Sequence, residues 1–575
     1  MSRHANSKRG RAVAGAVPAA PPEAAVRVVI DGVERFCAAG TPAGELARFS
    51  RGRPGLPYIA CLVNHDVCSL TYPLDVNATV RFLTMTDTYG MRVYRDSITF
   101  LLARAIAGLF PGARYQLEHS FGSGFYCSFE LDGKPGISPA ALRRLDGALR
   151  DIVRRNRPIE RRKVAFMEAV RIFEADGQTD RLNLLRFMNP PKIVTYWCDG
   201  YSDLAHGPIA PSTGPIRFFK IVPYAGGFVL QIPERSETGR IPPFRDRPKL
   251  FQIFRDHKNW GRTVGVSNVG RLNELIASKS MGEFVKMSES FHEKKIAGMA
   301  DRICLSSGRV RAVFISGPSG AGKTTFSKRL GVQLQVNGIR PIMISLDDYY
   351  VSDEDTPRDE QGRPDYEHID AIDTDLFNRH LSDLLRGREI DLPSFNFETK
   401  RREFRGRKLR LAPGQILVVE GIHGLNPNVS RAVPDRKKFK IYISALTQLN
   451  IDAHNRISTT DNRIMRRLVR DNLFRGNTAL TTLRMWPSVR RGEKRWVFPF
   501  QEQADAMFNS ALDYELAVLK PFADPLLMEV KPSEPEYAEA RRLLQFLSHF
   551  LEITVSDVPS TSLLREFVGE SSFTY

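Results

Sequence analysis

The stretch Arg-Ala-Val-Phe-Ile-Ser-Gly-Pro-Ser-Gly-Ala-Gly-Lys-Thr-Thr, residues 311–325, decides the fold of the C-terminal half of the chain. Its first six residues form an apolar run typical of a buried strand. The run leads directly into residues 317–324, which match the pattern GxxxxGK[ST], and helix-compatible residues continue to Val336. Glycines here let successive backbone N–H groups turn toward an anion, and the following helix N-terminus adds positive potential. The strand, loop and helix together predict a phosphate-binding loop.

The side chains of this loop have separate expected roles. The Lys323 ammonium should reach the β- and γ-phosphates of a nucleotide, and the Thr324 hydroxyl should bind Mg²⁺. ATP and Mg²⁺ are therefore the expected cofactors. The residues expected to bind the nucleotide are Gly317, Ser319, Gly320, Ala321, Gly322, Lys323, Thr324 and Thr325.

Two further apolar runs end in acidic residues. Residues 341–346 predict a strand followed by Asp347, and residues 416–419 predict a strand followed by Glu420. Carboxylates at the C-terminal ends of parallel strands lie beside a phosphate site. There Asp347 is expected to orient or deprotonate an attacking hydroxyl or to contact the metal through water, and Glu420 to act on the magnesium shell. The alternatives are a helix or turn cap for Asp347 and a strand-end turn for Glu420.

Two blocks between these strands place polar groups next to aromatic rings. They are Asp-Tyr-Glu-His-Ile-Asp at residues 365–370 and Leu-Pro-Ser-Phe-Asn-Phe at residues 392–397. Carboxylates beside aromatic rings suit a sugar diol and a stacked ring. Taken alone, each block is more often a loop or a core element.

The segment 456–495 is rich in arginine. It contains 11 basic and 3 acidic residues, a net charge of 11 − 3 = +8. Arg463, Arg467 and Arg470 are three to four residues apart and lie on one helix face. Like charges on one face repel, so we expect an anion to neutralise them. A lid that closes over phosphates accounts for the pattern, and a solvated basic face or an RNA contact are the alternatives.

Six blocks in this order resemble the uridine kinase family of P-loop nucleoside kinases. They are GPSGAGKT, SLDDYY, YEHIDAID, LPSFNF, VVEGIHGL and RIMRRLVRDNLFRG, within residues 300–530. The resemblance implies ATP-dependent phosphorylation of a nucleoside 5′-hydroxyl. It also implies that Asp347 lies beside that hydroxyl and that Lys323, Arg467 and Arg470 take part in catalysis. The residues that it assigns to the nucleoside pocket and the lid are Tyr350, Glu367, Phe395 and Arg475.

Three positions depart from the pattern of this family. Glu367 stands where the family usually has Asp, Phe395 where it has Tyr, and Lys400 where it has His. These positions contact the sugar and the base, so the departures leave open whether the acceptor is uridine or cytidine. The phosphate chemistry does not depend on them.

The N-terminal half contains strand and helix patterns of a different kind. Residues 26–30 predict a strand that enters a hairpin turn at Asp31 and Gly32, and residues 58–64 form another apolar run. Helical periodicity follows at residues 96–110, 140–157 and 273–303. Strands are predicted at residues 192–197 and 216–222, and residues 234–249 read as a linker or loop.

This half resembles two parts of threonyl-tRNA synthetases. Residues 26–83 resemble the TGS domain, a small β-grasp module, and residues 86–230 resemble the editing-like second domain. The phrases that carry the second resemblance are DSITFLL from residue 96, GFY from residue 124, and DLAHGPI from residue 203 before PSTG. The synthetase metal ligands correspond here to Asp96, Phe100, Ala205 and Ile209. Phe, Ala and Ile offer no lone pair to zinc, so we expect neither a metal site nor editing hydrolysis.

The composition agrees with a folded protein of several domains. At about 150 residues per domain, 575 residues suggest three or four units. Hydrophobic residues make up 42 % and charged residues 26 %, which excludes a wholly disordered, collagen-like or coiled-coil chain. No apolar run reaches about 18 residues, so a membrane span is not expected. The six scattered cysteines argue against a disulfide framework or structural zinc and favour a reducing compartment, which predicts a cytoplasmic location.

The predicted fold class is multidomain, α+β and α/β. Residues 1–24 carry Arg3, Lys8, Arg9 and Arg11 with no acid before Glu23, which predicts a disordered basic tail or an organellar transit peptide. The predicted units are the tail 1–24, a TGS-like β-grasp 25–84, an editing-like domain 85–232, a linker with helices 233–300, a P-loop uridine kinase-like α/β domain with a parallel sheet 301–535, and a C-terminal helical extension 536–575.

Three functions compete at this stage. The first is a nucleoside kinase that uses the P-loop, Asp347, Glu420 and the arginine lid. The second is a kinase of another small hydroxylated metabolite or sugar, favoured by the departures at Glu367 and Phe395. The third is an RNA- or ribosome-binding regulator whose P-loop acts as a switch, favoured by the TGS-like module and the net charge of +18. An oligomer is compatible with all three.

Overall fold

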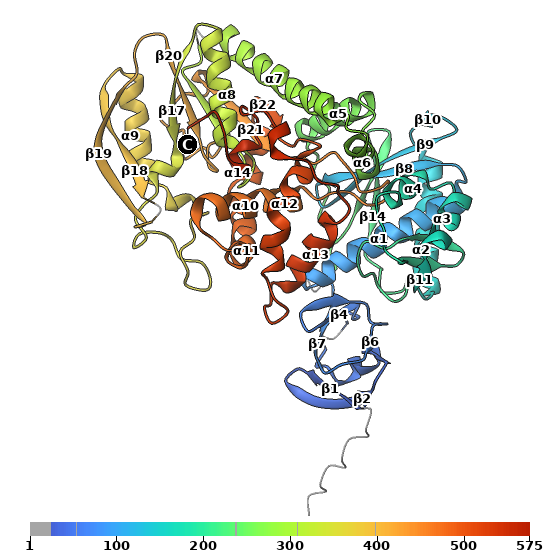
Figure 1. Cartoon of the computed structure of the whole chain (residues 1–575). Helices are drawn as coiled ribbons and strands as arrows, with labels where there is room; N and C mark the ends of the chain where they lie inside the picture. Colours follow the sequence, from blue (N-terminus) through green and yellow to red (C-terminus); the bar gives the residue numbers. More distant parts are fainter. Residues whose placement is uncertain (1–24, 53–54, 236–238, 307–308, 397, 575) are drawn as a thin grey trace, which may run out of the picture.

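The protein is described from a computed structural model, which covers residues 25–52, 55–235, 239–306, 309–396 and 398–574. The tail or transit peptide predicted for residues 1–24 lies outside the described residues. The mixed α+β and α/β multidomain fold predicted from the sequence is confirmed. In Figure 1 a small β module lies below two larger bodies, with the parallel sheet on the left and the N-terminal α+β region on the right.

The small module is built around the hairpin predicted from residue 26. Asp31 and Gly32 have φ of 49° and 78°, the left-handed conformation that a two-residue hairpin turn requires. The sheet has the order β2-β1-β7-β4-β5, in which β1 is antiparallel to β2 and parallel to β7. The elements are β1 (Ala25–Ile30), β2 (Val33–Ala38), β3 (Thr41–Pro42), η1 (Ala43–Phe49), β4 (Ala60–Val63), β5 (Asp66–Cys68), β6 (Pro73–Leu74) and β7 (Ala78–Leu83).

The second region packs two long helices against antiparallel sheets. One sheet has the order β10-β9-β15-β14 with β8 on β9, and the other has the order β11-β12-β13. The elements are α1 (Thr88–Leu109), β8 (Arg114–Phe121), β9 (Gly124–Leu131), β10 (Lys134–Pro135), α2 (Pro139–Arg155), β11 (Glu160–Ala165), α3 (Phe166–Ala175), α4 (Thr179–Leu185), β12 (Lys192–Cys198), β13 (Tyr201–Leu204), β14 (Lys220–Tyr224) and β15 (Gly227–Gln231).

Three element boundaries differ from the sequence prediction. Helix α1 begins at Thr88 rather than at residue 96, and its first turn contains Gly90, a weak helix former that obscures the helical pattern. The strand predicted at 216–222 begins only at Lys220, because Phe218 donates its N–H to Tyr94 Oη at 2.7 Å and accepts from the same hydroxyl at 3.0 Å. The helix predicted at 273–303 is divided in two, and Lys279 between the halves has φ of 57°.

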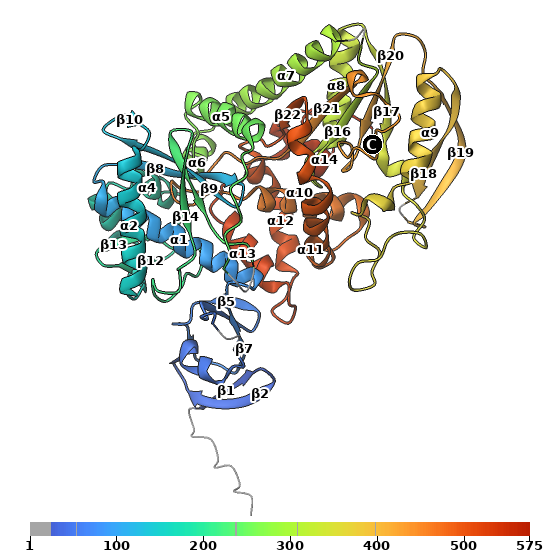
Figure 2. The same cartoon turned by 180° about the vertical axis from the view of Figure 1, so that it is seen from behind.

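Helices connect this region to the parallel sheet. The connecting helices are α5 (Pro248–Thr263), α6 (Val269–Ala277) and α7 (Met281–Leu305). Figures 1 and 2 show α7 running over the top of the molecule from the N-terminal region to the sheet. It ends just before the stretch that begins the phosphate-binding loop.

The C-terminal half contains a five-stranded sheet in which every pairing is parallel, with the order β17-β20-β16-β21-β22. Such a sheet buries both faces, which explains the unbroken apolar runs in its strands. Its elements are β16 (Ala312–Ser316), α8 (Lys323–Val336), β17 (Arg340–Ser345), η2 (Leu346–Tyr349), η3 (Ile369–Ala371), α9 (Thr374–Leu385), β18 (Glu389–Asn396), β19 (Arg401–Arg410), β20 (Gln415–Glu420), η4 (Asp435–Lys437), β21 (Lys438–Ser444), α10 (Thr459–Arg475), α11 (Ala479–Trp496), η5 (Phe498–Gln503) and β22 (Ala506–Asn509).

The last helices join the two halves. One hydrophobic core contains residues of α3 and α4 together with residues of the C-terminal helices, among them Phe173, Leu184, Leu468 and Leu543. The small module also touches these helices, where Arg541 pairs with Asp66 at 3.0 Å. The helices are α12 (Glu515–Met528), α13 (Tyr537–Leu547), η6 (Val555–Asp557) and α14 (Arg565–Val568). Among the described residues, no helix is both long and apolar enough to cross a membrane.

Candidate active site

The phosphate-binding loop passes closely over the sheet. A Cβ on Gly317 would lie 2.2 Å from the Ile443 carbonyl oxygen, so only glycine fits there. Gly320 and Gly322 have φ of 75° and 80°, a conformation that favours glycine. Helix α8 begins at the next residue, and the N–H groups of its first turn have no partner within the helix. The loop therefore presents backbone donors to an anion, as the sequence predicts.

Lys323 is partly buried in the site. Burial lowers the pKa of its ammonium group, and the nearby carboxylates of Glu420, Asp347 and Glu566 oppose that shift. Its Nζ lies 3.5 Å from the carbonyl oxygen of Pro318, the second residue of the loop. A cation surrounded by acids in a phosphate-binding loop is suited to neutralise a phosphate chain.

Thr324 and Glu420 lie together as expected for a magnesium site. The Thr324 hydroxyl donates to Glu420 Oε1 at 3.4 Å, and the Ser345 hydroxyl donates to the same oxygen at 3.1 Å. Burial raises the pKa of Glu420 to about 7, and the charge of Asp347 adds to this effect. Within the described ranges no group of three or more His, Cys, Asp or Glu could hold a metal. This oxygen donor set fits Mg²⁺, which takes one or two protein ligands and completes its shell with phosphates and water.

Asp347 stands at the end of β17, in the first turn of η2. Its N–H donates to Ser345 Oγ at 3.3 Å, which fixes the backbone of the turn. Burial is the main reason that the pKa values of Glu367 and Tyr350 are raised, and the charge of Asp347 raises both further. The charge of the Asp347 carboxylate therefore acts both on Lys323 of the phosphate-binding loop and on two residues of the predicted acceptor pocket.

The residues predicted to hold the acceptor lie together. The rings of Tyr350 and Phe395 have centroids 5.4 Å apart. Glu367 Oε2 is buried and has no hydrogen-bond partner among the described residues. A Cβ on Gly492 of α11 would lie 2.2 Å from Glu367 Cβ, so the glycine makes room for this carboxylate. A buried acid without a partner beside two rings is suited to bind a donor group of a ligand.

Helix α10 packs directly on the phosphate-binding loop. Arg467 donates from Nη1 to Ser319 Oγ at 2.9 Å, and Arg463 donates from Nε to Ser319 O at 2.8 Å. Arg466 donates from Nη1 to Gly320 O at 3.2 Å. Arg463 and Arg467 belong to the arginine face predicted from residue spacing, whereas Arg466 does not.

Carboxylates of the protein itself neutralise part of the positive charge on this arginine face. Asp471 is buried and pairs with Arg467 at 3.0 Å, with Arg470 at 2.7 Å and with Arg475 at 3.6 Å. Arg463 pairs with Glu493 of α11, and Arg466 pairs with Glu515 of α12. The arginines of this face do lie next to negative groups, as the sequence predicts. Protein carboxylates relieve much of the repulsion between the arginines without a bound phosphate.

Sequence reasoning missed two carboxylates that contact loop amides. Glu493 Oε1 accepts from the Ser319 N–H at 3.1 Å, and Glu566 Oε2 accepts from the Thr325 N–H at 3.0 Å. The partners are 174 and 241 residues apart in the chain. No local pattern could have connected them, whereas Asp471 follows Arg467 by one helical turn and was visible in principle.

A loop of the C-terminal half packs against the region where the metal ligands of the synthetases would lie. His206 Nε2 lies 2.7 Å from Asp452 Oδ2, and His454 Nδ1 lies 2.7 Å from Asp203 Oδ2. Arg181 of α4 lies between them, 3.0 Å from Asp203 and 3.7 Å from Asp452. These contacts fasten the segment just before α10 to the N-terminal region.

The sequence of this half matches a family model. Residues 312–517 match the model described as Phosphoribulokinase / Uridine kinase family. This part of the chain is therefore similar to that family. The matched segment contains the phosphate-binding loop, Asp347, Glu420 and helix α10, whereas Glu566 and the N-terminal residues Arg181, Asp203 and His206 lie outside it.

The N-terminal region is similar to curated threonine–tRNA ligases. The chain is 27 % identical over 244 residues to the ligase of Pelobacter propionicus, covering 41 % of this chain and 38 % of that protein. It is 29 % identical over 199 residues to the ligase of Desulforamulus reducens, covering 34 % and 31 %. The chain thus spans about a third of the length of these relatives.

Solved kinase structures also match the chain at low overall similarity. A uridine kinase candidate from Bacillus stearothermophilus is 19 % identical with a TM-score of 0.25, covering 36 % of this chain and 97 % of that one. The D-glycerate 3-kinase from Cryptococcus neoformans is 15 % identical with a TM-score of 0.20, covering 47 % and 87 %.

Proposed function

We propose that the chain is an ATP-dependent kinase that phosphorylates a hydroxyl of a nucleoside similar to uridine or cytidine. The observation that carries this proposal is the shared position of Lys323, Asp347 and Glu420 at one edge of the parallel sheet, beside the phosphate-binding loop. The match of residues 312–517 to the model of the Phosphoribulokinase / Uridine kinase family supports it.

In the proposed reaction an acceptor hydroxyl attacks the γ-phosphate of ATP in line. Asp347 accepts the proton of that hydroxyl, while Lys323 and the backbone donors of the loop hold the phosphate chain. Bound Mg²⁺, held by Thr324 and Glu420, would neutralise charge on the phosphate oxygens. Arg467 and Arg470 stabilise the charge that develops on the transferring group. Positioning and electrostatics supply most of the catalysis in such a site.

The acceptor is held by the pocket on the far side of Asp347. In this proposal the rings of Tyr350 and Phe395 stack on the base, and Glu367 accepts hydrogen bonds from the sugar diol. Arg475, whose charge acts on Tyr350, closes the pocket from helix α10. Burial of Glu367 without a hydrogen-bond partner in the described residues supports this role, because a ligand donor would remove the cost of burying its oxygen.

A second kinase reaction has a specific observation in its favour. Glu367 is longer by one methylene than the acid usual in the family, and Phe395 lacks the hydroxyl of the usual tyrosine. Both changes fall in the acceptor pocket and leave the phosphate site intact. A smaller hydroxylated metabolite or sugar is therefore the alternative acceptor class.

One assay tests the function and separates these acceptors. The protein is incubated with Mg·ATP and a panel of nucleosides, sugars and small hydroxy acids, and phosphorylated products are identified by mass spectrometry. A nucleoside monophosphate supports the main proposal, and a phosphorylated sugar or acid supports the alternative. No product from any acceptor, with the protein folded, would remove both.

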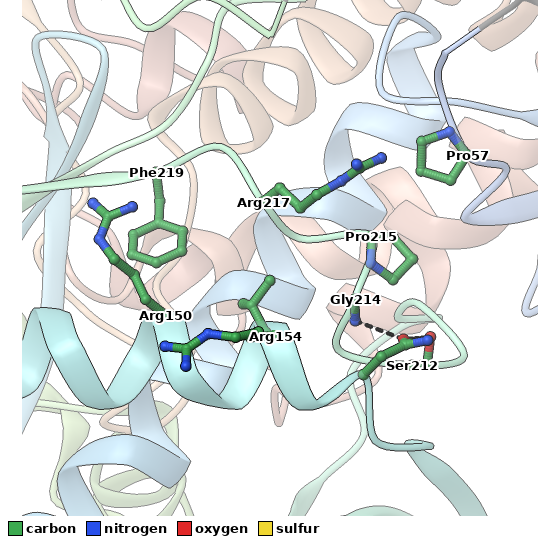
Figure 3. Close-up of a pocket in the computed structure, with 10 residues that line it drawn as sticks. Pro57, Arg150, Arg154, Ser212, Gly214, Pro215, Arg217 and Phe219 are labelled. Carbon is green, nitrogen blue, oxygen red and sulfur yellow. Dashed lines mark hydrogen bonds between the residues drawn. The ribbon is translucent and has the colours of Figure 1, made fainter.

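An RNA contact in the N-terminal region is the other candidate activity. Arg150 and Arg154 of α2, Arg217 and Phe219 line a surface pocket of about 650 Å³. Figure 3 shows Arg150 beside the Phe219 ring and Arg217 extending toward Pro57. Residues 139–162 carry arginine at eight positions and acids at three. Basic groups of this density suit a phosphate backbone.

The RNA candidate predicts steep salt dependence. The binding constant for an RNA hairpin should fall as the salt concentration rises, and the slope of log K against log salt concentration should correspond to several phosphate contacts. Changing Arg150, Arg154 and Arg217 together to Ala should reduce that slope. Arg143→Ala, which lies on α2 outside this pocket, is the control. Binding no tighter than that of an unrelated basic protein would exclude this activity.

A further inference from the structure

The segment 562–568 lies on the start of the phosphate-binding helix. A Cβ on Gly322 would lie 3.1 Å from Leu563 Cδ2 and 4.0 Å from Phe567 Cε2. Leu563 belongs to the same hydrophobic core as Ala321 and Phe326 of the loop and its helix. This segment is thus seated over the loop.

Glu566 of this segment contacts the donors that a nucleotide phosphate would use. Its Oε2 accepts from the Thr325 N–H at 3.0 Å and from the Thr325 hydroxyl at 2.7 Å. Thr325 is in the first turn of α8, where a backbone N–H has no intrahelical partner and is a natural phosphate donor. A carboxylate oxygen and a phosphate oxygen cannot occupy this position together.

The charge of Glu566 also acts inside the site. It is among the acids that oppose the lowering of the Lys323 pKa by burial, after Glu420 and Asp347. A phosphate chain that approached Lys323 would therefore meet three carboxylates. Two of them, Glu420 and Asp347, have proposed roles in catalysis, whereas Glu566 has none.

Other contacts hold the segment in place. Arg565 donates from Nη2 to the carbonyl oxygens of Val558 at 2.6 Å and Val555 at 3.0 Å. The Phe567 ring lies under the Arg466 guanidinium, with 5.0 Å between the guanidinium carbon and the ring centroid. The apolar side chains keep the backbone seated, while Glu566 itself is only half-buried. Rotation of this one side chain would clear the Thr325 donors without unseating the segment.

We propose that residues 562–568 form an autoinhibitory strap in which Glu566 occupies a phosphate position of the nucleotide site. The nucleotide has to displace the Glu566 carboxylate before its phosphates reach the Thr325 N–H. Because this displacement reduces the fraction of protein competent to bind, the strap lowers the apparent affinity for ATP. The proposal rests on the proposed function, since it requires that the loop binds a nucleotide. In addition to the proposed function, Glu566 acts as an internal competitor of the nucleotide. This competition sets the ATP concentration that the kinase requires.

The test compares nucleotide affinity in matched variants of the full chain. Glu566→Gln keeps the size of the side chain and one oxygen acceptor but removes the charge, and Glu566→Ala removes both. Glu570→Gln is the control, because Glu570 is an exposed neighbouring acid that pairs with Arg565 rather than with the loop. Dissociation constants for Mg·ATP, Mg·ADP and adenosine are measured by calorimetry, and melting temperatures verify that each variant is folded.

The strap predicts tighter binding of phosphate-bearing ligands only. Glu566→Ala should bind Mg·ATP and Mg·ADP more tightly by about fivefold or more, Glu566→Gln should shift in the same direction, and adenosine should be unaffected. Equal or weaker ATP binding by both Glu566 variants would overturn the strap while leaving the kinase proposal standing. If neither the wild type nor any folded variant binds nucleotide, the proposed function fails and the strap fails with it.

Discussion

Arg467 donates a hydrogen bond from Nη1 to Ser319 Oγ at 2.9 Å, which joins the arginine helix to the phosphate-binding loop. The same guanidinium pairs through Nε with the buried Asp471 at 3.0 Å. Arg467 is therefore held in a fixed orientation next to the place where phosphates are proposed to bind. Its neighbours on α10 bond to the loop backbone, so loop and helix form one rigid unit.

The first prediction concerns this arginine. Arg467→Lys keeps the charge but cannot hold both Ser319 and Asp471, because an ammonium lacks the planar fork of the guanidinium. Phosphoryl transfer should fall by about a hundredfold or more, with a smaller change in ATP affinity. Steady-state kinetics and calorimetry measure the two quantities. Arg484→Lys, an exposed residue on α11 paired with Glu534, is the control. A rate for Arg467→Lys equal to that of the control would contradict the assigned role.

A second prediction concerns Gly492, whose missing side chain makes room for Glu367. A methyl group there would overlap the Glu367 Cβ, so Gly492→Ala should displace the carboxylate from the acceptor pocket. The KM for the acceptor should rise by about tenfold, while ATP affinity stays within about twofold. Gly282→Ala in α7 is the matched control, because nothing lies within 4 Å of the added Cβ there. Unchanged acceptor KM would show that Glu367 does not contact the acceptor.

The third prediction concerns the buried ion cluster between the two halves. Arg181→Met removes the cation and leaves Asp203 and Asp452 buried without it, which should cost about 3–5 kcal/mol of unfolding free energy. Urea unfolding measures this quantity. The exposed Arg186, which pairs with Glu274, provides the control, and Arg186→Met should cost no more than about 1 kcal/mol. Similar losses in both variants would argue against a charge cluster that fastens the halves together.

The fourth prediction concerns pH. Burial raises the pKa of Asp513 from 3.8 to about 7, the charge of Glu515 adds to the effect, and Lys258 opposes it. A carboxyl whose pKa is raised in the folded state stabilises the protein below its unfolded pKa, and this contribution is lost as pH rises through the folded pKa. The unfolding free energy of the wild type should therefore decline between pH 3.8 and about 7, with a slope of up to about 1.4 kcal/mol per pH unit. Asp513→Asn should remove this decline.

Urea unfolding across this pH range checks the sign. Above about pH 7 the Asp513→Asn variant should be more stable than the wild type, because it avoids ionising a buried group. Asp370→Asn, at an exposed position, should leave the pH profile unchanged. If both variants follow the wild-type profile, Asp513 does not carry the raised pKa.

Local pattern was sufficient to predict the elements around the candidate phosphate site. The strand, loop and helix at residues 311–336 lie within one continuous stretch, Glu420 is the last residue of β20, and Asp347 lies two residues after the end of β17. Parallel strands bring their carboxyl ends to one edge, so residues far apart in the chain meet by a general rule. The acceptor pocket was placed by the family resemblance, because the two blocks alone indicate only loops or core.

The long-range contacts around this site could not be predicted in the same way. Glu566 meets Thr325, Glu493 meets Ser319 and Asp452 meets His206 only because the last helices and the N-terminal region pack against the sheet. No local pattern around any of these acids indicates its distant partner. The break at Lys279 was missed for another reason, since the apolar period continues across it with only a short interruption.

The central claim is tested most directly by transfer of labelled phosphate from γ-labelled ATP. The wild type and Lys323→Ala are compared on the acceptor panel, and melting curves verify that the variant is folded. We predict a labelled product with the wild type and its loss, by about a thousandfold or more, with Lys323→Ala. A wild type that labels no acceptor, or a variant that labels one at the wild-type rate, would contradict the account.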